Sequence, residues 1–150
     1  MVYLGADHAG FGIKKEIKKF FETCCIEYKD LGASEYDPGD DYPPYAKAVS
    51  ESVVSDPGSF GVLICGSGTG MVIAANKVKG IRAAFGFSEY AAKMAREDNN
   101  ANVLTFSGRK QEGSEVIKMI KVFLETPFST SPRYTRRLEE LSKLEDSFGS

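Results

Sequence analysis

A cysteine followed by alternating glycines is the part of this sequence best suited to chemistry. Cys65 ends an apolar run and is followed by Gly-Ser-Gly-Thr-Gly at positions 66–70. Glycine has no Cβ, so this backbone can turn sharply and direct successive N–H groups at one point. A helix expected from Met71 to Lys77 adds unpaired N–H groups and the positive end of its dipole. The segment predicts a small anion site beside Cys65, where positive partial charges favour the thiolate.

Other glycine-rich phosphate loops have a different spacing. Glycines at 66, 68 and 70 do not match G-x-G-x-x-G, and no Gly-Lys-Ser/Thr follows as in a nucleotide P-loop. A cysteine phosphatase would need an arginine just past the loop, where this chain has Met71. The alternative is a tight strand-to-helix turn with a buried cysteine. We favour the anion site because three glycines with two hydroxyl residues between them exceed what a turn requires.

The elements that position this loop alternate between strands and helices. Short apolar runs at 2–6, 26–31, 62–64, 81–87 and 103–106 predict five strands. The first helix is expected to bury Ile13, Ile17, Phe20, Phe21 and Cys24, with Lys14, Lys15, Lys18 and Lys19 on the opposite face. Another helix is expected from a cap at Ser88 to about Arg96. This alternation predicts a single α/β domain over residues 1–150, a three-layer α/β/α sandwich around a parallel sheet.

Polar residues also follow other strands, at the carboxyl end of the sheet where Cys65 is expected. Asp7 and His8 come directly after the first strand. The acidic segment 32–44 contains Tyr42, and long loops in compact domains often bind ligands. The structural alternatives are that Asp7 caps the next helix, that His8 is a partly buried polar residue, and that Tyr42 covers the sheet edge.

The C-terminal segment predicts a helix that packs on another surface. Ser131 is a suitable cap, and Pro132 suits the first helical position. Leucines at 138, 141 and 144 form a narrow apolar stripe that suits packing on a second subunit. Arg133 and Arg137 lie four residues apart and share a face. The alternative for these two arginines is a solvated basic face.

Composition narrows the class of protein. The chain is 42 % hydrophobic and 27 % charged, with a net charge of −2, so we expect no nucleic-acid partner. We expect no membrane segment and, without the charged and apolar regions of a signal peptide, a cytoplasmic protein. Three cysteines give no disulfide framework, and a single histidine gives no metal-ligand cluster, so we expect no metal.

The order and spacing of these motifs resemble the type B ribose-5-phosphate isomerases, whose superfamily includes galactose-6-phosphate isomerase subunits and allose-6-phosphate isomerases. The resemblance runs from Val2 to about Leu141 and is carried by the Cys65 loop together with residues 7–10, 41–43, 74–77 and 80–84. It implies a Rossmann-like five-stranded sheet. It also implies a cofactor-independent aldose–ketose isomerase that moves a proton between C2 and C1 of a phosphosugar through an enediolate.

The resemblance also implies roles for single residues. Cys65 matches the thiolate base, and Ser67 is placed to hydrogen-bond the substrate oxygens. The other substrate-binding positions that the resemblance and the loop predict are Asp7, His8, Tyr42, Gly66, Gly68, Thr69, Gly70, Asn99, Arg109, Arg133 and Arg137. The C-terminal arginines are expected to serve the neighbouring active site of a homodimer or tetramer.

Two positions depart from the family pattern. Asp98-Asn99 stands where most members have a His-Asn segment credited with ring opening, and Tyr134 replaces a histidine. We therefore expect Asp98 to act as a base on the ring hydroxyl. The departures leave open another aldose 6-phosphate as substrate, or a non-catalytic phosphosugar-binding subunit. A thiol-redox protein is disfavoured because no second cysteine lies near Cys65.

Overall fold

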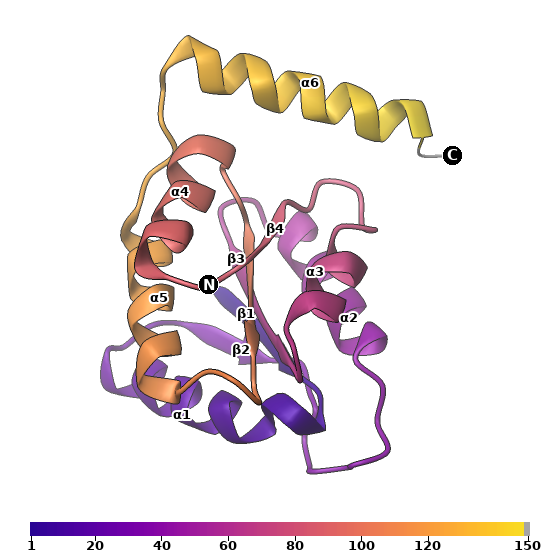
Figure 1. The fold of residues 1–150 in the computed structure, drawn as a ribbon, viewed down its shortest axis with the longest axis vertical. Helices are drawn as coiled ribbons and strands as arrows, with labels where there is room; N and C mark the ends of the chain where they lie inside the picture. The colour runs from indigo at the N-terminus through magenta and orange to yellow at the C-terminus, as the bar shows by residue number, and fades with distance from the viewer. Residues whose placement is uncertain (149–150) are drawn as a thin grey trace.

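The computed structural model describes residues 1–148 and has a parallel sheet of five strands between two layers of helices (Figure 1). The strands are β1 (Val2–Ala6), β2 (Tyr28–Asp30), β3 (Phe60–Cys65), β4 (Ala83–Phe85) and β5 (Val103–Ser107). Their order is β2-β1-β3-β5-β4, and every pairing is parallel. The predicted α/β sandwich with a five-stranded parallel sheet is confirmed.

The helices cover the two faces of the sheet unequally. One apolar cluster joins the sheet to α1 (Phe11–Thr23), α4 (Glu89–Asn99) and α5 (Gly113–Glu125). A second cluster joins the other face to α2 (Pro43–Ser55) and α3 (Thr69–Ala75). A short 3-10 helix, η1 (His8–Gly10), leads from β1 into α1. The last helix, α6 (Pro132–Phe148), belongs to neither cluster.

Strand β3 is central and buried on both faces. Val62 and Ile64 belong to the cluster under α1, α4 and α5, whereas Leu63 and Cys65 belong to the cluster under α2 and α3. Alternation of side chains along a strand produces this division. The thiol of Cys65 is therefore on the α2 and α3 side of the sheet, at the carboxyl end of its central strand.

Several predicted boundaries change in the structure. β2 and β4 are three residues each, shorter than the predicted runs 26–31 and 81–87, because each is an edge strand with one hydrogen-bonding neighbour. Helix α3 begins at Thr69 instead of Met71.

Two side chains of α1 lie where the sequence pattern did not place them. Lys14, predicted on the polar face, is 2 % exposed because its ammonium donates to Asp30 at 2.9 Å and to the Ala33 carbonyl. Cys24, predicted on the buried face, is exposed just after the helix ends. The apolar periodicity of α1 therefore misplaces both residues.

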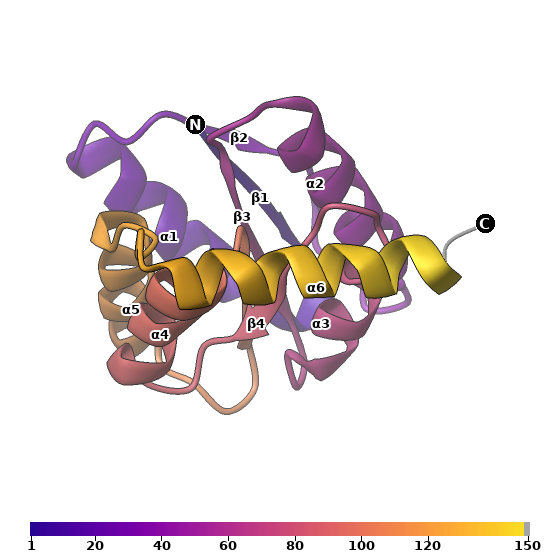
Figure 2. The same ribbon diagram turned by 90° about the horizontal axis from the view of Figure 1, so that it is seen from above.

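Helix α6 lies across the end of the sheet where the strands begin, and Figure 2 looks down on it as it passes from α4 toward α3. None of its described residues is buried. Asp146 pairs with Lys79 at 2.6 Å, and Glu145 accepts from the Gly80 amide at 3.0 Å. Among residues 1–148, no helix has the length and apolar character needed to cross a membrane.

Candidate active site

The loop after β3 is fixed by hydrogen bonds to the neighbouring strand β5. The Ser107 hydroxyl donates to the Gly66 carbonyl at 2.6 Å, and the Thr105 hydroxyl donates to the Gly68 carbonyl at 3.0 Å. The Gly68 amide donates to Cys65 Sγ at 3.2 Å. Cys65 is only 4 % exposed, so this loop both covers the thiol and directs a backbone donor at its sulfur.

Glycine is required in this loop for space and for backbone conformation. Gly68 has φ of +83°, and a Cβ there would lie 2.9 Å from the backbone of Phe106. A Cβ on Gly66 would lie 2.9 Å from Arg109 Nη1, and a Cβ on Gly70 would lie 2.6 Å from Tyr42 Cζ. The bare backbone thus lets Arg109 and Tyr42 pack directly against the loop.

Two hydroxyl groups lie at the exposed side of the same loop. Ser67 Oγ and Thr69 Oγ1 are 2.8 Å apart, and the Thr69 amide donates to Ser67 Oγ at 3.4 Å. Both side chains are accessible to a ligand, because this pair is exposed. A thiol and two hydroxyl groups are therefore presented by five consecutive residues.

Asp7 lies beside the loop, since its backbone N–H donates to the Ile64 carbonyl at 3.2 Å. Its Oδ1 accepts from the amides of Ala9 and Gly10 at 3.0 and 3.2 Å, which is the capping role considered from the sequence. Burial raises the pKa of Asp7, although these amides and His8 act in the opposite direction. Asp7 therefore both closes the turn after β1 and places a carboxyl group at the carboxyl end of the sheet.

Asp40 joins the site, although its sequence neighbourhood did not single it out. Its Oδ1 lies 2.8 Å from His8 Nδ1 and accepts from the His8 backbone N–H at 3.0 Å. Glu35, Asp37 and Asp41 occupy the same loop, and nothing in the sequence distinguishes which acidic residue turns inward. The signal is spatial, because only the fold brings this loop against the turn after β1.

Comparison with known proteins matches residues 2–141 to the Ribose/Galactose Isomerase family. The chain belongs to this family. It is 42 % identical over 144 residues to ribose-5-phosphate isomerase B of Mycobacterium tuberculosis strain H37Rv, covering 96 % of this chain and 89 % of that one. It is therefore an isomerase of the type B ribose-5-phosphate isomerase group, as its motifs predicted.

Solved structures of relatives have the same fold as this isomerase. The Mycoplasma genitalium ribose-5-phosphate isomerase B with bound ribulose-5-phosphate has a TM-score of 0.91 and 40 % identity, covering 97 % of this chain and 95 % of that one. The Clostridium thermocellum ribose-5-phosphate isomerase B has a TM-score of 0.92 and 34 % identity, covering 99 % of each chain. The likeness therefore extends across both ends of the sheet.

A single chain of the isomerase brings together only part of the predicted site. The Cys65 loop, Asp7, His8, Tyr42 and Arg109 converge at the carboxyl end of the sheet. Predicted residues at the other end are Asp98, Asn99, Arg133 and Arg137, which lie on α4 and α6.

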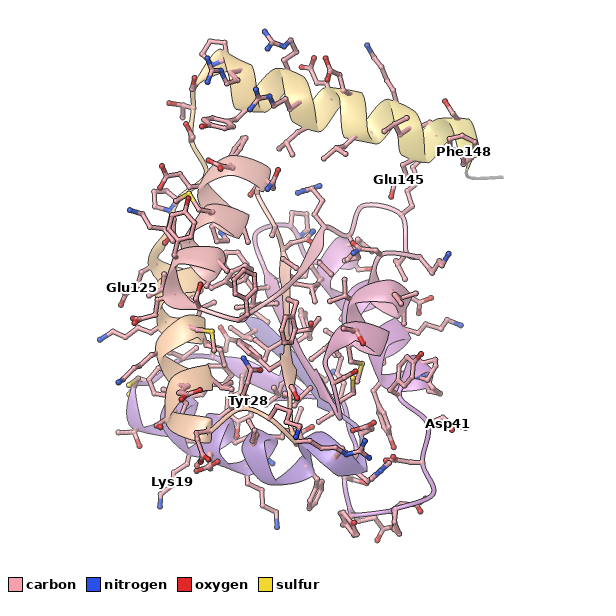
Figure 3. The ribbon with its side chains drawn as sticks, viewed as in Figure 1. Lys19, Tyr28, Asp41, Glu125, Glu145 and Phe148 are labelled. Carbon is pink, nitrogen blue, oxygen red and sulfur yellow. The ribbon has the colours of Figure 1, made fainter. Side chains whose placement is uncertain are left out.

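The separation of the two groups follows from the topology. Asn99 is the last residue of α4, and its carbonyl accepts at 3.1 Å from Arg82, which immediately precedes β4. Asn99 is therefore at the end of the sheet where the strands begin. Figure 3 shows this separation: Asp41 lies near the carboxyl end of the sheet, and Glu145 of α6 lies at the opposite end. Arg137 and Asp98 thus cannot reach the thiol of their own chain.

One group of potential metal ligands occurs among residues 1–148. Asp7, His8 and Asp40 offer ligand atoms within 4.8 Å of one another. Each already has hydrogen-bond partners, because Asp7 caps η1 and Asp40 binds His8. These hydrogen bonds hold the turn after β1, and they explain why the three side chains lie together.

Proposed function

We propose that this isomerase interconverts ribose 5-phosphate and ribulose 5-phosphate, with Cys65 as the base. The observation that carries the proposal is the Cys65 thiol, held at 3.2 Å by the Gly68 amide, at the carboxyl end of the central strand. The near full-length likeness to ribose-5-phosphate isomerases supports the choice of sugar.

The reaction needs one proton to move between two carbons. The Cys65 thiolate takes the proton from C2 of the open-chain aldose, and the electron pair passes to the C1 carbonyl oxygen to give the enediolate. Cys65 then returns the proton to C1 while the proton of the C2 hydroxyl moves to the C1 oxygen, which gives the ketose and restores the thiolate. Donors aimed at such an oxyanion are each worth about 3 to 4 kcal/mol, a role suited to the backbone of the glycine loop and the Ser67 hydroxyl.

The remaining groups at this end hold the substrate. Arg109 packs on Gly66 and offers a permanent positive charge to the phosphate. Tyr42 packs on Gly70 and presents an aromatic ring to the sugar. Asp7 and His8 are placed to bind hydroxyl groups of the open chain. No step in this scheme requires a cofactor or a metal.

The site is completed by a second copy of the chain. Asp98, Asn99, Arg133 and Arg137 lie at the opposite end from the thiol, so another subunit must bring them to it. Helix α6 is suited to an assembly because none of its described residues is buried and Leu144 is 57 % exposed. A cavity of about 280 Å³ also separates the leucines of α6 from the residues before β4. We propose a homodimer or tetramer with shared sites.

Replacing the base tests the catalytic role. Cys65→Ala should abolish isomerisation and leave substrate binding within about tenfold, because the loop and the arginines remain. Cys65→Ser should also be very slow, since a hydroxyl is a far weaker acid than a thiol. Cys24→Ala is the matched control, because Cys24 is exposed and lies beyond the end of α1. If Cys65→Ala keeps more than about a tenth of wild-type turnover, the base is another residue.

Assays with a panel of sugar phosphates distinguish this function from the alternatives. Turnover of an aldose 6-phosphate of the allose or galactose type, with none of ribose 5-phosphate, would reassign the sugar. Binding of sugar phosphate without exchange of the C2 proton with solvent would identify a non-catalytic subunit. The replacement of the usual histidine by Asp98 makes both controls necessary.

Mixing two inactive variants tests the shared site. Cys65→Ala and Arg137→Ala chains should each be inactive, and partial activity should return when they reassociate. One site of each hybrid then has an intact cysteine and an intact arginine from the partner. Failure to complement, with hybrids confirmed by native mass spectrometry, would place Arg137 outside the neighbouring site.

A further inference from the structure

Asp40 contacts both the backbone and the ring of His8. Its Oδ1 accepts from the His8 backbone N–H at 3.0 Å and lies 2.8 Å from ring Nδ1. Its Oδ2 accepts from the Tyr45 hydroxyl at 3.1 Å. This one carboxylate therefore joins the turn after β1, the loop before α2 and the first turn of α2.

These contacts determine which nitrogen of His8 carries a proton. Burial acts to raise the pKa of Asp40, but the hydrogen bonds from His8 and Tyr45 outweigh it and lower the pKa below its ordinary value. An ionised carboxylate only accepts hydrogen bonds, so the hydrogen in the 2.8 Å contact belongs to Nδ1. Neutral His8 is then the Nδ1–H form, with its lone pair on Nε2.

Nε2 is the ring atom left for a ligand. It has no hydrogen-bond partner among residues 1–148, whereas Nδ1 is engaged by Asp40. The His8 side chain is 24 % exposed and the Asp40 side chain only 7 % exposed. A ligand at this end of the sheet therefore meets the imidazole, with the carboxylate behind it.

The loop that carries Asp40 is tied to α1 at its start and closed by a turn just before Asp40. At its start, the buried ammonium of Lys14 binds the Ala33 carbonyl. Near its end, Asp37 accepts from the Gly39 amide at 2.9 Å, and its carbonyl accepts from the Asp40 amide at 3.1 Å. The Asp40 carboxylate is thus held in place, as a positioning role requires.

We propose that Asp40 is a positioning residue for substrate binding, which holds His8 in the Nδ1-protonated form and leaves the Nε2 lone pair to accept a hydrogen bond from a hydroxyl group of the sugar. This inference rests on the proposed function, in which His8 binds the substrate. Asp40 itself does not touch the reacting atoms. Its loss should therefore weaken binding more than it slows the proton transfer at Cys65.

Nitrogen-15 NMR can measure the ring directly, because His8 is the single histidine of the chain. At an alkaline pH where imidazole is neutral, two-bond correlation spectra of the wild type should show the proton on Nδ1. Asp40→Ala should shift the ring toward the Nε2–H form. Asp40→Asn, which keeps the size of the side chain and one acceptor oxygen, should shift it partly.

Matched variants separate this effect from a general disturbance of the loop. Glu35→Gln removes an exposed charge from the same loop, and Tyr45→Phe removes only the bond to the other carboxylate oxygen. Both should keep the Nδ1–H form. With ribose 5-phosphate, Asp40→Ala should raise KM about tenfold and change kcat less than about threefold. The reason is that His8 loses its hydrogen bond to the charged Asp40 carboxylate and is no longer held for the substrate. Glu35→Gln should leave both within about twofold.

Two results would overturn the inference. One is an unchanged tautomer in Asp40→Ala, and the other is a KM for Asp40→Ala no higher than that of Glu35→Gln. The proposed function fails separately, if wild-type protein does not isomerise ribose 5-phosphate. The tautomer spectra still decide in that case whether Asp40 controls His8.

Discussion

The two halves of the Lys14–Asp30 ion pair should contribute unequally to stability. The Lys14 side chain is 2 % exposed, and its ammonium has two acceptors, Asp30 Oδ1 at 2.9 Å and the Ala33 carbonyl. Asp30 is 20 % exposed and also binds the Lys18 ammonium and the Gly32 amide, each at 3.0 Å. Removing Asp30 leaves a buried cation without a counter-ion, whereas removing Lys14 leaves a carboxylate with other partners and water.

The expected magnitudes follow from this asymmetry. Asp30→Ala should lower the free energy of unfolding by about 4 kcal/mol, as expected for a buried charge that has lost its partner. Lys14→Met should lower it by about 1.5 kcal/mol, because methionine fills the space of the lysine stem and Asp30 keeps Lys18. The double variant should be more stable than Asp30→Ala alone, since no buried charge is then unpaired.

Urea unfolding at a fixed chain concentration and several pH values measures these differences. Burial acts to raise the pKa of Asp30, but bonds from Gly32, Lys14 and Lys18 outweigh it and lower the pKa below 3.8. A carboxyl group with a lowered pKa contributes stability that is present above its unfolded pKa and lost as pH falls through its folded pKa. The difference in free energy of unfolding between wild type and Asp30→Ala should therefore narrow below about pH 4. A larger loss from Lys14→Met than from Asp30→Ala, or a difference between wild type and Asp30→Ala that does not narrow as the pH falls, would refute this reasoning.

Three further predictions concern the glycine loop and the far end of the sheet. Gly68→Ala should lower the free energy of unfolding by about 3 kcal/mol, because a φ of +83° strains alanine and its Cβ would meet the Phe106 backbone at 2.9 Å. Thermal unfolding measures this, and an unchanged midpoint would contradict the loop geometry. Gly70→Ala should raise KM, because the new Cβ would push the Tyr42 ring aside. The free energy of unfolding should change by less than about 1 kcal/mol, because position 70 lies in helix α3, where alanine is well tolerated. Equal KM values in steady-state assays would show that Tyr42 does not need to lie on Gly70. Asp98→Asn should slow turnover of cyclic ribose 5-phosphate much more than the reverse reaction, and Asp98→His should restore or exceed the wild-type forward rate. Equal slowing in both directions, in a transient assay of the chemical step, would rule out ring opening by Asp98.

The central part of the fold could be predicted because its pattern is independent of distant neighbours. The continuous apolar run of β3 is typical of a strand covered on both faces, and the structure buries it under helices from both layers. The ends of β2 and β4 depend instead on where a single neighbouring strand stops pairing. Local sequence carries no record of that limit, so both strands are shorter than their apolar runs.

The site could be predicted where a residue type has a local reason to be there. Alternating glycines after a buried strand are such a reason, and they led to Cys65 and its loop. Lys14 and Asp40 have no local reason, because one resembles its exposed neighbours on α1 and the other lies among acidic loop residues. Only the packing of η1 and α1 against β2 and the loop that follows it shows that both are held by specific partners.

The position of α6 also has a consequence for how the reaction rate depends on the amount of protein. If each thiol needs arginines from another copy, an isolated chain holds two half-sites and no complete one. Rate per chain should then fall on dilution through the dissociation constant of the assembly, and activity plotted against concentration should curve upward. A cell that makes little of this chain would lose the reaction before it lost the protein.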